Sequence, residues 1–129
     1  MQVLKMLALP LVLVATVSGA QEATKQHSIS GTAAQEIRAG WFGKLNADCS
    51  SGPIPEARVI NPAANGTITL RKARIRTNSV ARCPNAELSA LVVFYRSKPG
   101  YSGSDSFTLE VTGESEVPSL QKYDVKIEG

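Results

Sequence analysis

The sequence is poor in the residues on which catalysis and metal binding most often depend. It has one histidine, two cysteines and one tryptophan among 129 residues, and aromatic residues make up only 5%. A Ser–His–acid triad needs a positioned histidine, a structural zinc site needs about four ligands, and the sequence has no phosphate-binding loop or dinucleotide fingerprint. We therefore expect a non-enzymatic protein with no metal and no other cofactor, although the eleven acidic residues leave open an enzyme that uses carboxylates alone.

The chain is also short and only weakly charged. Its length fits one small domain and leaves no room for a second. The formal net charge of +3 is too small to indicate a nucleic-acid partner. Beyond the first twenty residues, no apolar stretch is long enough to span a membrane. We expect a single soluble domain once the N-terminal segment has been removed.

The one long apolar run lies at the N-terminus, from Met6 to Val17. It is followed by small residues, with Ser18 and Ala20 in the positions that signal peptidase requires. At about a dozen residues, the run is too short to cross a hydrocarbon core of ~30 Å. The pattern predicts a signal peptide over residues 1–20, cleaved before Gln21, and a periplasmic or secreted protein.

Cys49 and Cys83 are the only cysteines, and both lie in the part expected to be exported. An even number of cysteines in an oxidising compartment indicates a disulfide. The bridge would close a loop of about 35 residues and stabilise the fold by ~3–4 kcal/mol. A redox pair or a metal site is the alternative, but there is no C-x-x-C spacing and two thiols cannot complete a zinc site.

The mature chain opens on a polar segment. Residues 21–34 contain few large apolar side chains and are predicted to form a flexible lead-in, in which His27 is solvated and has no role. The only helix candidate, Ala33 to Arg38, is too short to be stable alone. The folded domain is therefore expected to occupy residues 35–129.

From Glu56 onward, apolar and polar residues alternate in short runs separated by turn signals. The predicted strands lie at 57–60, 67–77, 88–96, 105–112 and 120–128. The apolar positions change parity between Leu70 and Ala73, which predicts a bulge near Arg71 and Lys72. Short strands of this kind are typical of an all-β protein with an antiparallel β-sandwich.

A family resemblance lies in the segment from Val93 to Val111, which reads VFYRSKPGYSGSDSFTLEV. A strand ending in tyrosine, a stretch with proline and then Gly-aromatic-x-Gly-x-Asp-x-Phe resemble the signature of bacterial Ig-like and cadherin-like repeats. The run from Asn65 to Ile68 is similar to the Gly-Thr-hydrophobic entry of the same repeats. The resemblance covers about half of the mature chain and implies an Ig-like antiparallel β-sandwich with one disulfide. It does not imply calcium binding, because the acidic calcium motifs of cadherins are not evident.

Elementary conformational chemistry explains part of this segment. Gly100 and Gly103 allow backbone angles that other residues rarely adopt. Asp105 can accept backbone N–H bonds and stabilise the turn before the next strand, which makes a turn residue the preferred interpretation of this carboxylate.

Lys72, Arg74 and Arg76 share parity on one predicted strand, so their side chains project from one face. The first interpretation is a solvated edge strand protected by charge against unwanted pairing. The second is an electropositive site for an anionic partner, such as an envelope protein or an anionic glycan.

Two aromatic residues are candidate contacts. Tyr101 lies on a glycine-flanked turn, where it is either an interface anchor at the tip of the domain or a side chain that packs back over the end of the sandwich. Trp41 is more simply explained as a core residue than as a ligand contact, because tryptophan buries so much apolar area.

Together these features predict an exported, non-catalytic Ig-like binding or structural module of the bacterial cell envelope. The alternative is a small exported inhibitor of a host or competitor hydrolase, with the loop from Lys98 to Ser104 entering the active site. The identity of the partner and the oligomeric state stay open.

Overall fold

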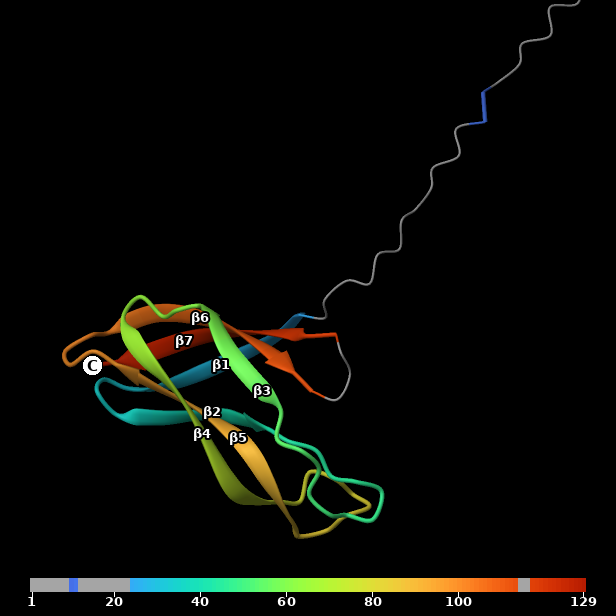
Figure 1. The fold of residues 1–129 in the computed structure, drawn as a ribbon. Coiled ribbons are helices and arrows are strands. Elements are labelled where there is room, and N and C mark those ends of the chain that lie inside the picture. The colour runs from blue at the N-terminus through green and yellow to red at the C-terminus, as the bar shows by residue number, and fades with distance from the viewer. Residues whose placement is uncertain (1–9, 12–23, 114–116) are drawn as a thin grey trace, which may run out of the picture.

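A computed structural model describes residues 10–11, 24–113 and 117–129 of the chain. The predicted signal peptide, apart from residues 10 and 11, and its cleavage site before Gln21 lie outside the described residues. All regular secondary structure in the described part is strand (Figure 1). This part of the chain contains no helix long and apolar enough to cross a membrane.

The described residues form two sheets that pack face to face (Figure 1). The strands are β1 (Thr24–Thr32), β2 (Glu36–Phe42), β3 (Glu56–Asn61), β4 (Gly66–Thr77), β5 (Ala86–Ser97), β6 (Gly103–Thr112) and β7 (Ser119–Glu128). The order is β1-β7-β6-β3 in the four-stranded sheet and β2-β5-β4 in the three-stranded sheet. The predicted all-β sandwich is confirmed, with one difference: β1 pairs parallel to β7, whereas every other pair is antiparallel.

The core between the sheets comes from the alternating strands. β6 contributes Phe107 and Leu109 and β7 contributes Tyr123 and Val125, all at most 3% exposed. The Phe107 ring stacks on the Tyr123 ring with centroids 4.4 Å apart and on the Tyr95 ring of β5 at 6.0 Å. This stack holds the middle of the sandwich together, because buried aromatic rings contribute both area and ring–ring attraction.

The two tyrosines of this stack should make the fold sensitive to alkali. Burial raises the pKa of Tyr123 to about 12, and burial together with the bond to Asp105 raises the pKa of Tyr95. The folded protein therefore retains protons that the unfolded chain releases above about pH 10. We expect stability to be unaffected by these groups below that pH and to fall at higher pH by about 1.4 kcal/mol per unit for each tyrosine.

Urea unfolding followed by circular dichroism between pH 9 and 11.5 measures this slope. Tyr123→Phe should reduce this slope by about 1.4 kcal/mol per pH unit, the contribution of one proton. An unchanged slope in that variant would contradict the assignment of Tyr123 to the titration.

The segment predicted to be a flexible lead-in is instead strand β1, which pairs with β7 over its whole length. His27 is not simply solvated: its Nε2 lies 2.6 Å from Gln121 Oε1, and its ring stacks on Tyr123 at 4.6 Å. The folded domain thus includes residues from Thr24, rather than from 35. The prediction failed because β1 is an edge strand with one large apolar residue, Ile29, so its sequence does not alternate as the strands of the core do.

The helix candidate is also wrong, since Ala33 to Gln35 form a turn and β2 begins at Glu36. A register shift between Arg38 and Gly40 interrupts the pairing of β2 with β5. This irregularity hides the strand from a search for strict alternation.

The bulge predicted near Arg71 and Lys72 is absent, because β4 pairs with β5 residue for residue from Gly66 to Thr77. The parity of the apolar residues changes for another reason. Leu70 packs against the core between the sheets, whereas Ile75 packs on the other side of the same sheet against a second cluster. β4 therefore keeps its register with β5, but its buried side changes along its length: the inner side is buried near Leu70 and the outer side near Ile75.

Asp105 secures the turn that carries the chain from β3 to β4. Its carboxylate accepts N–H bonds from Ala64 and Asn65, each at 3.1 Å, and from Ser106 at 2.9 Å. Its Oδ2 also accepts a bond of 2.7 Å from the Tyr95 hydroxyl. Asp105 thus accepts backbone N–H bonds in a structural role, as predicted, but the turn that it stabilises is the one between β3 and β4 and not the one before its own strand.

Gly66 follows this turn and lies directly against the ring of Tyr95. A Cβ at Gly66 would come within 2.6 Å of two ring carbons and 2.7 Å of the Arg96 carbonyl oxygen. Glycine is needed here because nothing larger fits between the strand and the buried tyrosine.

Candidate binding surface

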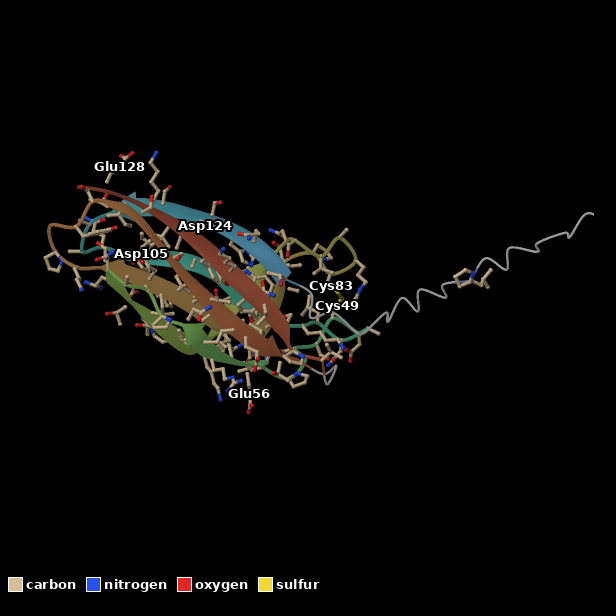
Figure 2. All side chains as sticks on the ribbon, turned by 90° about the horizontal axis from the view of Figure 1, so that it is seen from above. Cys49, Glu56, Cys83, Asp105, Asp124 and Glu128 are labelled. Carbon is tan, nitrogen blue, oxygen red and sulfur yellow. A yellow bond between two sulfur atoms is a disulfide. The ribbon has the colours of Figure 1, made fainter. Side chains whose placement is uncertain are left out.

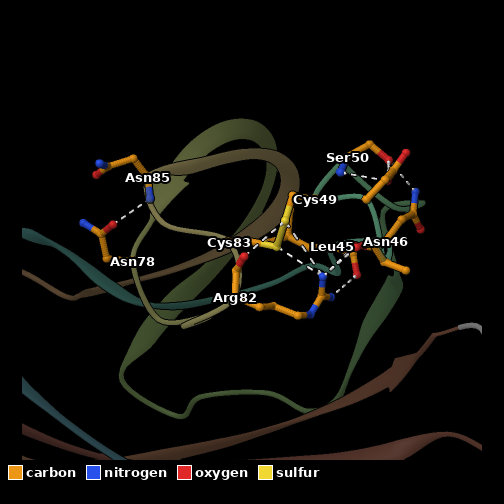
Figure 3. The surroundings of a disulfide bond; sticks show 10 residues. Leu45, Asn46, Cys49, Ser50, Asn78, Arg82, Cys83 and Asn85 are labelled. Atoms are coloured by element: carbon orange, nitrogen blue, oxygen red, sulfur yellow. Dashed lines mark hydrogen bonds between the residues drawn. A yellow bond between two sulfur atoms is a disulfide. The ribbon is translucent and has the colours of Figure 1, made fainter.

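The two cysteines form the predicted disulfide (Figure 3). Cys49 lies in the loop between β2 and β3, Cys83 lies in the loop between β4 and β5, and their Cα atoms are 5.6 Å apart. Arg82 adds a second link, because its Nη1 donates to the carbonyl oxygens of Asn46 and Ala47 at 3.1 Å each. Cys83 is 1% exposed, which fits a structural bridge rather than a reactive one.

Tyr101 folds back onto the domain. Its ring is half-buried against the core between the sheets, and its hydroxyl donates to the carbonyl oxygen of Ser104. Gly100 and Gly103 have φ angles of 76° and 130°, so this tight loop depends on glycine. The packing interpretation of Tyr101 is supported, because the ring lies against the domain.

Trp41 is a half-buried residue of β2 and packs against the second apolar cluster. The buried members of this cluster are Leu45, Cys83, Ala86 and Leu88. The indole also lines a surface cavity of about 330 Å³ together with Phe42, Pro53 and Pro55. Its main contacts are those of a core residue, as expected.

The carboxylates of the described residues are largely engaged in structural contacts. Glu36, Glu87 and Glu110 pair with arginines at distances from 2.6 to 3.7 Å. Asp105 is bonded within the fold, as described above. In the part of the chain that the structure covers, no three His, Cys, Asp or Glu side chains come together as a metal site would require.

The structure brings Lys72, Arg74 and Arg76 together on β4, the strand at the free edge of the three-stranded sheet. We call these residues the basic row. They lie on the same side of the sheet as Ile68 and Leu70, because residues two apart on a strand share a face. The side chains of the two arginines are more than 60% exposed. The basic row therefore lies on the part of this inner face that the four-stranded sheet does not cover.

The basic row has more positive charge than its neighbours neutralise. Glu87 is shared by Arg76 at 2.7 Å and Arg74 at 3.7 Å. Lys72 forms no ion pair with any described residue. One carboxylate is thus shared by two of the three cations, and exposed pairs of this kind contribute little to stability. Glu56 lines the same cavity as Lys72 but makes no ion pair with it among the described residues.

Arg71, the fourth cation of β4, belongs to the opposite face of the sheet. Its guanidinium lies 2.6 Å from Glu36 and 4.1 Å from the centre of the Phe94 ring. Arg96 shares the same carboxylate at 3.7 Å. The charge of Arg71 is therefore engaged on its own sheet and is not part of the basic row.

Beside the basic row, the sandwich is open between its edge strands β3 and β4, which lie on the same side of the domain (Figure 1). A cavity of about 310 Å³ occupies this opening, and we call it the β3–β4 groove. It is lined by Ile54, Pro55, Glu56, Ala57, Leu70, Lys72 and Leu91. Figure 2 shows Glu56 at this edge of the sandwich.

Two apolar side chains of the edge strand β3 are exposed. Val59 of β3 is 38% exposed, although its pairing partner Leu109 is completely buried. Ile60 is 36% exposed. Sequence reasoning identified the basic row but missed this opening, because the local pattern of a strand does not show whether another strand covers it.

No protein-family model matches the chain, and the comparison with curated proteins found no match either. The resemblance to bacterial Ig-like repeats therefore depends on the residues quoted above and is compatible with the two-sheet fold.

Proposed function

We propose that this chain is an exported, non-catalytic binding module of the bacterial cell envelope, and that the basic row binds an anionic partner. The observation that carries the proposal is the unneutralised charge of the row on an exposed strand edge. Such a surface attracts anions over a distance comparable with the Debye length, about 8–10 Å at moderate ionic strength.

The disulfide supports the proposed location. Bridges of this kind form and persist in oxidising compartments such as the periplasm or the extracellular space. The engaged carboxylates support a role without catalysis, because a pair of acids held by arginines is poorly placed to transfer protons to a substrate.

The test is affinity capture from a detergent-solubilised envelope extract of the source cells. The protein is exported from a producing host, purified oxidised and immobilised. A second column carries the triple variant Lys72→Ser, Arg74→Ser, Arg76→Ser. We expect a specific partner to be retained by the first column, to be reduced at least tenfold on the second, and to elute as salt increases.

A third column controls for net charge. The exposed residues Lys98, Lys122 and Lys126 are changed to serine, which removes the same number of charges away from the basic row. This variant should retain the partner. Equal capture by all three columns, or an equal loss on both variant columns, would contradict a binding site at the basic row.

A further inference from the structure

We infer that the partner is an extended segment of another protein, which adds a strand to the free edge of β4 and inserts alternate apolar side chains into the β3–β4 groove. This inference rests on the proposed function, since it specifies what binds at the basic row. Strand addition to an open sheet edge is a recurrent mode of recognition, in which the main chain supplies affinity and alternate side chains supply specificity.

β4 is well suited to accept a strand. It has 12 residues, contains no proline and pairs with β5 without a register shift, while its other edge is the end of the sheet. The unpaired N–H and C=O groups of such an edge are a template for another chain.

The other edge strands are less suitable. β3 has six residues and a register shift between Val59 and Asn61, and β2 has a shift between Arg38 and Gly40. β1 and β2 contact each other on their side of the sandwich, so that side is not open as the β3–β4 side is.

The side chains of β4 determine what the added segment must contain. Along the inner face, β4 presents Ile68 and Leu70 first and then the basic row. Side chains on neighbouring strands meet when they share a face of the sheet. The complementary segment therefore has apolar residues beside Ile68 and Leu70 and acidic residues beside the row.

The apolar half of this segment can be accommodated in the β3–β4 groove. Leu70 and Leu91 line the β3–β4 groove from one sheet and Ala57 lines it from the other, while Lys72 and Glu56 supply its charged part. The groove volume of about 310 Å³ accommodates one or two aliphatic side chains. Their burial would remove exposed apolar surface from water, which is the main source of favourable free energy in association.

A second copy of this chain is a poor occupant. Pairing β4 with β4 would bring two basic rows close together, and like charges opposite one another destabilise paired strands. A glycan or another polyanion would satisfy the charges but leave the apolar part of the groove and the backbone edge unused.

The test uses designed peptides and the oxidised, exported protein. One 12-residue peptide alternates so that its inward residues are valine beside Ile68 and Leu70 and glutamate beside the basic row. A second has the reverse order, because the added strand can run in either direction. Isothermal titration calorimetry compares them with a scrambled peptide of the same composition, with poly-glutamate and with a sulfated glycan.

We expect one of the two designed peptides to bind at least tenfold more tightly than the scrambled peptide and poly-glutamate. N-methylation of alternate residues separates the two edges of the added strand: methyl groups on the edge facing β4 should abolish binding, and those on the outer edge should not. The effects of peptide on amide chemical shifts should concentrate at β4 and at groove residues such as Ala57 and Leu91.

The outcomes distinguish this inference from the proposed function. If both designed peptides bind no better than the scrambled peptide, or if both N-methylated forms bind equally, strand addition is overturned. If capture of the envelope partner depends on the basic row, but the glycan or poly-glutamate binds as tightly as the designed peptides, the proposed function stands and the inference fails. If capture does not depend on the row, both fail.

Discussion

Replacement of Cys49 and Cys83 by alanine is expected to lower the free energy of unfolding by about 3–4 kcal/mol. The bridge closes a loop with a sequence separation of 34 residues, which limits the conformations of the unfolded chain. For a domain of this size, the loss corresponds to a fall in melting temperature of roughly 10–20 °C. It is a large share of the ~5–15 kcal/mol by which small proteins are stable.

The location of the bridge explains why little else can compensate for its loss. It joins the β2–β3 loop to the β4–β5 loop at the end of the sandwich opposite Asp105 (Figure 2). There, the small second cluster and a bond of 2.8 Å from the Ser89 N–H of β5 to Ser51 Oγ hold these loops to the sheet, and the bonds from Arg82 hold the two loops to each other. Without the bridge, we expect this end to open first, while the aromatic stack between the sheets stays folded.

Guanidinium unfolding of the oxidised protein and of the double variant measures the difference. Wild-type protein unfolded in the presence of a reductant is the control, and its stability should approach that of the variant. Equal stability of oxidised and reduced protein would show that the bridge restrains the unfolded chain much less than its loop length predicts.

The features predicted correctly from the sequence depend on local pattern or on residue chemistry alone. β6 and β7 alternate strictly because one side of each strand faces the core and the other faces water. The disulfide followed from two cysteines and a predicted signal peptide. In each case the information lies in a few adjacent residues or in a residue count, so no knowledge of the tertiary structure was needed.

The features that were missed depend on what covers each strand. β1 is polar because it lies at a sheet edge, and β2 loses its alternation at the Arg38–Gly40 irregularity. β4 changes its buried face halfway along, since the loops tied by the disulfide cover its outer side near Ile75. The β3–β4 groove could not be anticipated for the same reason: it exists because two edge strands, β3 and β4, are not covered there.

Asp105→Asn is expected to be the most damaging single substitution of a polar residue, with a loss of about 3 kcal/mol in the free energy of unfolding. Each oxygen of the native carboxylate accepts two bonds, and Asp105 is only 9% exposed. Whichever way the asparagine amide is oriented, its NH₂ group would face a backbone N–H that has lost its acceptor. A buried donor without a partner costs about 1–3 kcal/mol.

Two further variants show that the effect belongs to this network. Tyr95→Phe removes one of the four bonds and should cost about 1 kcal/mol. In the Asp105→Asn background the same change should cost less, since the hydroxyl has already lost a carboxylate partner. Asp124→Asn, on the exposed side of β7, is the matched control and should change stability by less than about 0.5 kcal/mol.

The decisive comparison is between Asp105→Asn and Asp124→Asn in urea unfolding at neutral pH. If both variants are as stable as the wild type, the turn between β3 and β4 holds its shape without the carboxylate. If Asp105→Asn alone is destabilised, the residue that aligns β3 with β4 is identified. Because these two strands border the groove, that variant should also weaken binding of the designed peptide under conditions in which it is still folded.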